Sequence, residues 1–204
     1  MSKYASLSFV ELGNIKMPQA KLDDAEKLFQ SVLKLPRANV EDKSYANYQL
    51  ARIFSFKNDF ESARKYLMSV MGNLKDNIAN DAIELSILLN TAKNDSSNLS
   101  LYCNAEFLTA QKRFSEAKDL YMQLSQNPQA FVFHSIAKLR AAEMLIATDA
   151  FSAAIADLSL IVEEAEKNIY ADKALYLQGQ IYQYGLKDSV KAVESYENLL
   201  AKFS

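Results

Sequence analysis

Apolar residues recur along this chain every three to four positions, which is the spacing of a helix that buries one face. Short polar turns interrupt the pattern. The clearest turn joins 43–56 to 59–71 and reads Lys57-Asn58-Asp59. Pro36 ends an earlier segment, because proline cannot continue a helix. The pattern predicts eleven helices, ten of which form antiparallel pairs joined by tight turns.

Five alanines set the length of the repeated unit, and each is followed four residues later by an aromatic residue or a leucine. These anchor alanines are Ala25, Ala63, Ala117, Ala154 and Ala192, and their partners are Phe29, Leu67, Tyr121, Leu158 and Tyr196. Successive anchors lie 38, 54, 37 and 38 residues apart, so the second interval is one unit plus 16 residues. Sixteen residues form one extra helix, which we place at 77–93. We expect the anchors to be buried where two helices approach most closely.

A single pair of helices cannot bury its apolar stripe and must stack on its neighbours. We therefore predict an all-α solenoid that forms one domain over 1–204. Its repeats are expected at about 5–37, 43–73, 98–127, 129–167 and 170–203. The composition agrees, because 50% of the residues are hydrophobic and only four glycines and three prolines interrupt them.

The first helix of each unit carries a small residue twelve positions before the anchor, or thirteen in the last unit. These residues are Gly13, Ala51, Ala105, Ala142 and Gly179. A bulky residue stands three before most anchors, namely Leu22, Phe60, Phe114 or Phe151. We expect the small residue to let the second helix approach the first, with the aromatic residue filling the gap between them.

This combination resembles the tetratricopeptide repeat, whose signature joins Leu-Gly and Tyr on one helix to Ala-x3-Phe and a later Pro on the next. Leu12-Gly13 with Ala25-x3-Phe29 and Pro36 is one of the best matches. The resemblance implies a right-handed superhelix that binds proteins. The chain departs from the family's 34-residue length with units of 37 or 38, and Asn47, Lys138 and Ser189 replace bulky residues. Longer units of this kind resemble those of bacterial envelope proteins.

The residues that could carry chemistry are few. Cys103 lies in an apolar stretch and His134 opens a helix, so both are interpreted as structural residues. Adjacent acidic pairs such as Asp23-Asp24 point about 100° apart on a helix, which favours a solvated face over a metal site. We predict no catalytic residue, no cofactor site and no metal site, and the chain is not expected to be an enzyme.

Charge and hydropathy narrow the choice of partners. The net charge is −2 and no basic run occurs, so nucleic acid is not expected as a partner. No apolar stretch is long enough to insert into a membrane, and the first residues do not form a signal peptide. As written, the sequence favours the cytoplasm. A periplasmic or envelope location stays open if the chain is a fragment that lacks its signal peptide.

The concave wall formed by successive first helices is the expected binding surface. Positions three before, one after and five after the small residue should face it. The expected groove residues are Tyr48, Arg52, Phe56, Tyr102, Glu106, Leu139, Glu143, Tyr176, Gln180 and Tyr184. Tyrosine offers a large contact area at a low entropic cost. The alternative is that some of these side chains pack against the neighbouring repeat.

These patterns favour a non-enzymatic scaffold that holds a peptide or helix of a protein partner in its groove. A second hypothesis is a structural or self-associating module of a larger envelope protein. Val193, Tyr196, Leu199, Leu200 and Phe203 make the last helix apolar on more than one side. Since solenoid ends need a polar capping face, this helix would allow a homodimer.

Overall fold

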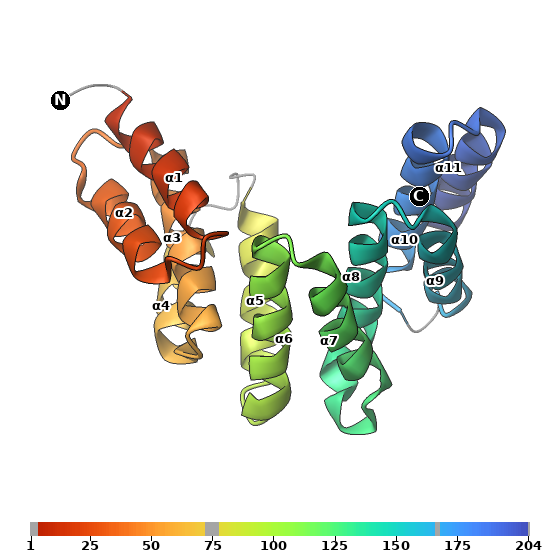
Figure 1. Ribbon diagram of the computed structural model, residues 1–204, viewed down its shortest axis with the longest axis horizontal. Coiled ribbons are helices and arrows are strands. Elements are labelled where there is room, and N and C mark those ends of the chain that lie inside the picture. The colour runs from red at the N-terminus through yellow and green to blue at the C-terminus, as the bar shows by residue number, and fades with distance from the viewer. Residues whose placement is uncertain (1–3, 72–77, 166–167, 204) are drawn as a thin grey trace. The chain divides into compact units, whose positions relative to one another are not determined.

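The computed structural model describes residues 4–71, 78–165 and 168–203, and every regular element in these residues is a helix (Figure 1). The prediction of an all-α fold with eleven α-helices in consecutive pairs is therefore confirmed for the described residues. The chain divides into two compact units, unit 1 (Met1–Lys112) and unit 2 (Arg113–Ser204). Residues 72–77 and 166–167, which hold the expected ends of two repeats and the start of the inserted helix, lie outside the described residues.

The described residues of unit 1 form six helices. They are α1 (Ala5–Lys16), α2 (Leu22–Lys34), α3 (Val40–Phe56), α4 (Phe60–Met71), α5 (Ala79–Thr91) and α6 (Ser96–Ala110). Helix α1 packs on α2, α2 on α3, and α3 on α4, so each pair buries its apolar stripe against the next. The core of the first two pairs includes Phe29, Val32, Leu50 and Ile53, all fully buried. Asn39 caps α3 through its side chain, which accepts a hydrogen bond from the Asp42 amide at 2.6 Å.

The inserted helix is α5, close to its expected bounds. It packs on α4, while α3 also contacts α6. Ala82, Leu88 and Leu89 of α5 are buried, so its apolar stripe is covered. Arg64 of α4 donates a hydrogen bond from Nη2 to the Leu89 carbonyl at 2.7 Å and fixes α5 beside α4.

Unit 2 repeats the arrangement of consecutive packed helices. Its elements are α7 (Phe114–Gln126), the 3₁₀ helix η1 (Pro128–Phe133), α8 (His134–Ala147), α9 (Phe151–Glu163), α10 (Ala171–Gln180), the π-helical turn η2 (Ile181–Gly185) and α11 (Ser189–Phe203). Helix α7 packs on α8, α8 on α9, α9 on α10, and α10 on α11. The helix expected from residue 129 begins later, because Pro128 starts a 3₁₀ turn that Ala130 interrupts with φ −93° and ψ 33°.

The five anchor alanines are buried, none more than 4% exposed, which confirms that expectation. The contact between the small residue and the aromatic residue is equally close. A Cβ added to Gly13 would lie 2.5 Å from the Phe29 ring, and one added to Gly179 would lie 2.3 Å from the Tyr196 ring. No side chain fits at either glycine unless the ring moves. The two helices of these pairs are therefore held at the distance that the ring allows.

A backbone feature recurs with the same period as the anchors. Among the described residues, five that are not glycine have a left-handed conformation with φ between 57° and 60°, and each stands five positions before an anchor. They are Ala20, Asn58, Lys112, Asp149 and Lys187. After three of them the next amide donates to the carbonyl five residues back, as in Asp59 to Phe54 at 2.8 Å. This bond closes the first helix in a Schellman motif and reverses the chain.

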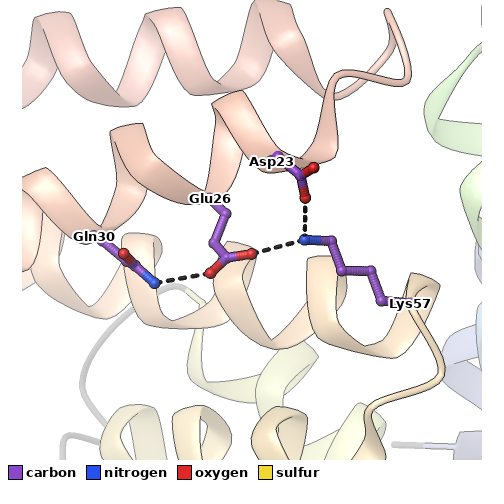
Figure 2. A network of polar contacts seen from close by, with 4 residues as sticks. All are labelled: Asp23, Glu26, Gln30 and Lys57. Carbon is purple, nitrogen blue, oxygen red and sulfur yellow. Dashed lines mark hydrogen bonds and ion pairs between the residues drawn. The ribbon is translucent and has the colours of Figure 1, made fainter.

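Ion pairs join one helix pair to the next in unit 1 (Figure 2). Lys57, at the end of α3, donates to Asp23 at 2.6 Å and to Glu26 at 2.8 Å, both on α2. Gln30 donates in turn to Glu26 at 2.9 Å. Burial lowers the pKa of Lys57, but the hydrogen bonds to the two carboxylates outweigh it and raise the pKa above its ordinary value. The hydrogen bond to Lys57 also lowers the pKa of Asp23.

Candidate functional site

In unit 1 the expected groove residues of α3 form a row with one helical turn between neighbours. Tyr48, Arg52 and Phe56 are all half-buried. The Arg52 guanidinium carbon lies 6.0 Å from the centre of the Tyr48 ring and 5.4 Å from that of Phe56. Its Nη1 donates to Gln49 Oε1 at 3.1 Å. The charge is thus held between two aromatic rings by cation–π contacts.

Helix α6 borders this row. Phe107 stacks on Phe56 with ring centres 5.0 Å apart, although Phe107 does not stand at an expected groove position. Glu106 is half-buried, whereas Tyr102 is only 3% exposed and packs inside the unit. Tyr102 therefore offers almost no surface to a partner.

In unit 2 the equivalent row runs from α10 into η2. Tyr176 is 47% exposed and Tyr184 is 63% exposed, with Gln180 between them. Gln180 donates from Nε2 to the Tyr176 hydroxyl at 3.1 Å. The Tyr196 ring of α11 lies behind Tyr176, with centres 6.1 Å apart. Both rows share the order aromatic, polar, aromatic, and we call them the α3 row and the α10 row.

The two remaining groove residues, both on α8, serve the packing of unit 2. Leu139 is fully buried. Glu143 accepts from Arg140 at 2.8 Å and from Lys173 of α10 at 2.9 Å. Burial would raise the pKa of Glu143, but the charges of Arg140 and Lys173 outweigh it and hold the pKa below its ordinary value. Glu143 thus joins α8 to α10, and its charge is already compensated.

The spacing from Gly179 to its anchor Ala192 is one residue longer than in the other repeats, and η2 accommodates the extra residue. The Leu186 amide donates to the Ile181 carbonyl at 2.8 Å, five residues back, and the Asp188 amide donates to Tyr182 at 2.8 Å, six residues back. An extra residue in a helix commonly forms such a π-helical turn, and these turns are frequent at functional sites. The thirteen-residue spacing from Gly179 to Ala192 is the sequence signal of this turn.

A cleft of about 350 Å³ opens beside this turn. It is lined by Ile146, Asp149, Phe151, Leu177, Gln180, Ile181, Tyr184 and Gly185. The lining comes from the turn between α8 and α9 and from the C-terminal part of α10 with η2. Two residues of the α10 row, Gln180 and Tyr184, therefore also face the cleft.

The C-terminal part of the chain is similar to a known family. Residues 173–204 match the family model described as tetratricopeptide repeat. This stretch of the chain is similar to a tetratricopeptide repeat. The match spans most of α10, with η2 and α11, so the α10 row and the cleft wall from Leu177 to Gly185 lie within the matched residues. No curated protein and no solved structure matches the chain. The unusual repeat length and the likeness to envelope proteins stay predictions.

Tetratricopeptide repeats are protein-interaction modules in general and typically carry no catalytic residues. Cys103 and His134, the two residues considered for catalysis, lie in surroundings that favour a structural role. Burial, with a smaller effect of the Glu106 charge, raises the pKa of the Cys103 thiol to about 12. His134 Nε2 lies 2.6 Å from the Asn127 carbonyl oxygen, at the turn after α7.

Two kinds of feature are absent from the described residues. In the described ranges, no three His, Cys, Asp or Glu side chains gather where they could hold a metal ion. Among the helices described, none combines the length and the apolar character that crossing a membrane requires.

Proposed function

We propose that this chain is a non-enzymatic scaffold that holds a peptide or a helix of a protein partner on the first helices of its repeats. The supporting observation is the pair of equivalent rows on α3 and α10. Each row presents two partly exposed aromatic rings about two turns apart, with a polar group midway between them. Such rings are the residues that most often supply binding energy at protein interfaces.

The polar group in each row offers hydrogen bonds to a partner. Arg52 is held between Tyr48 and Phe56, so it pays little further entropy when it meets a carboxylate or a carbonyl of a partner. Gln180 is fixed by Tyr176 and offers an amide to a peptide backbone. Tyr102 and Leu139 are left out of the proposed surface because they are buried, and Glu143 because Arg140 and Lys173 occupy it.

The test is quantitative affinity capture from extract of the cell of origin. Two double variants are compared with the unaltered chain, Tyr48→Ala with Phe56→Ala and Tyr176→Ala with Tyr184→Ala. Each ring should contribute about 1–2 kcal/mol, so recovery of the same partner should fall roughly tenfold or more. The matched control is Met68→Ala with Met122→Ala, because these exposed side chains lie on the second helices α4 and α7.

All variants must first melt as cooperatively as the unaltered chain. Loss of the partner in the row variants alone supports the proposal. Equal recovery by the row variants and the methionine control would place the binding surface on other helices.

A second candidate function is self-association through α11 within a larger envelope assembly. Four apolar side chains of this helix are exposed, namely Val190, Val193, Leu200 and Phe203. Analytical ultracentrifugation of the unaltered chain should then find a dimer that Val193→Glu with Leu200→Glu converts to monomer. A monomer at all concentrations would exclude this candidate.

A further inference from the structure

The cleft beside η2 has the size of a side-chain pocket. Its volume of about 350 Å³ is near the lower end of the roughly 300–1,000 Å³ typical of ligand pockets. Ile146, Phe151, Leu177 and Ile181 give it an apolar floor, and Asp149, Gln180 and Tyr184 bring polar atoms to it. Such a site suits a side chain that has both an apolar stem and a polar end.

The charge of the cleft is negative. Asp149 is exposed, and among the described residues its carboxylate has neither a hydrogen-bond partner nor an ion-pair partner. None of the residues that line the cleft is basic. Lys191, which follows in α11, is drawn toward Asp188 at 3.9 Å and lies 5.5 Å from the centre of the Tyr182 ring.

The helix ends around the cleft add to this charge. The C-terminal ends of α8 and of α10 with η2 reach the cleft, and each presents the negative end of a helix dipole. The N-terminal end of α9, at Phe151, contributes a positive end. Two negative ends and a carboxylate outweigh one positive end, so the cleft favours a cation.

We propose that the cleft binds an arginine or lysine side chain of a partner segment. The methylene stem lies against Phe151 and Ile181, and the cationic end lies between the Asp149 carboxylate and the face of the Tyr184 ring. Carboxylate and aromatic face are the two groups that bind a cation best at a protein surface. The inference rests on the proposed function, because it names the chemistry of one contact that the protein partner makes.

The π-helical turn of the last repeat carries the aromatic wall of this cleft. In η2 the chain carries Tyr184 and Gly185 past Phe151, and a Cβ added to Gly185 would lie 3.0 Å from the Phe151 ring. The four repeats with the twelve-residue spacing have no such insertion in their first helix. The site is therefore specific to the last repeat.

The test is a titration of the full-length, ¹⁵N-labelled chain followed by NMR. The probe is N-acetyl-arginine methylamide, and citrulline methylamide with the same acetyl cap is its uncharged isostere. We expect saturable shifts at the amides of residues 149–151 and 177–185 with arginine. Citrulline should bind about tenfold more weakly.

Two variants test whether the Asp149 charge is responsible for arginine binding. Asp149→Asn removes the charge and keeps the turn, because asparagine tolerates the left-handed conformation that residue 149 adopts. It should bind arginine no better than the unaltered chain binds citrulline. Glu163→Gln removes an exposed charge from α9 outside the cleft and should leave the titration unchanged.

Three results would overturn the inference: equal shifts with arginine and citrulline, an Asp149→Asn variant that binds arginine normally, or no saturable shift up to tens of millimolar. A preference for an acidic or purely apolar probe would assign the cleft to another occupant and would overturn it as well. Partner capture by the α3 row does not involve Asp149. The scaffold function can therefore hold while this inference fails, and the two failures are distinguishable.

Discussion

At the scale of single residues, the spacing between helices is set by rings that lie on residues with little or no side chain. Phe29 against Gly13 and Tyr196 against Gly179 are the closest of these contacts. The anchor alanines occupy the same kind of position on the second helices, where larger side chains have no room. The cost of enlarging such a residue follows from the close packing of protein interiors.

The first prediction compares two neighbouring alanines of α9. Ala154 is fully buried, whereas Ala153 is exposed. Ala154→Leu should lower the free energy of unfolding by about 1–3 kcal/mol through overpacking. Ala153→Leu should change it by less than about 0.5 kcal/mol. Chemical denaturation measures both, and equal stabilities would mean that the repeat register is misassigned.

The second prediction concerns the reactivity of the single cysteine. Since burial raises the pKa of Cys103 to about 12, almost no thiolate is present at pH 8 in the folded chain. Alkylation by iodoacetamide should be very slow in buffer and fast in denaturant. Rapid alkylation of the folded chain, at the rate of a free thiol, would contradict the buried position on α6.

At the scale of elements, the sequence predicted where each repeat lies along the chain. It did not predict the backbone conformation of the turns between helices. The anchors marked the second helices, and the left-handed residue five positions earlier follows the same phase. That conformation favours glycine, yet alanine, lysine, asparagine and aspartate adopt it here. The packing of the flanking helices enforces the left-handed conformation, so the amino-acid composition of the turns did not predict this conformation.

The third prediction tests whether η2 is an insertion. Deleting Gln183, an exposed residue of η2, restores the twelve-residue spacing of the other units. We expect the chain to stay helical and to melt cooperatively, since the other four units need no extra residue. The change of register rotates Tyr184 by about 100° relative to the cleft, so arginine binding should be lost. Loss of helical structure by circular dichroism would instead make the π-helical turn a requirement of folding.

The fourth prediction uses the ion pairs of Figure 2. The lowered pKa of Asp23 contributes stability above its ordinary pKa of 3.8, and this is lost as the pH falls through the lowered value. The raised pKa of Lys57 contributes stability below 10.5, and this is lost as the pH rises through the raised value. Lys57→Met should therefore reduce stability most between about pH 4 and pH 10, and only slightly, because solvent screens an exposed pair.

Thermal melting across that pH range measures the effect. Arg113→Met is a suitable control, because Arg113 pairs with Glu116 only one helical turn away, at the start of α7. A profile for Lys57→Met that is parallel to that of the unaltered chain would show that the network contributes nothing.

At the scale of the whole molecule, the helix periodicity and the anchor spacing were sufficient to predict an all-α chain of stacked pairs. The candidate surface was less predictable. Tyr102 and Leu139 stand at the same repeat position as Tyr48 and Tyr176, yet they are buried. Exposure of a first helix depends on what covers it, and neighbouring helices differ from unit to unit. A periodic pattern predicts which face of the helix a residue occupies. It does not predict whether a neighbouring helix buries that face.

The last prediction concerns the independence of unit 2, which holds its own core of fully buried residues such as Leu139, Leu158 and Ile161. In a repeat array stability is the sum of the units and of the contacts between neighbours. Residues 113–204 alone should therefore fold and melt cooperatively. Removing α7 as well, to leave 128–204, takes away the fully buried Tyr121 and Leu124 and uncovers α8, on which α7 packs. We expect that shorter piece to lose most of its helical signal by circular dichroism, and equal melting of the two pieces would show that α7 is not part of the unit's core.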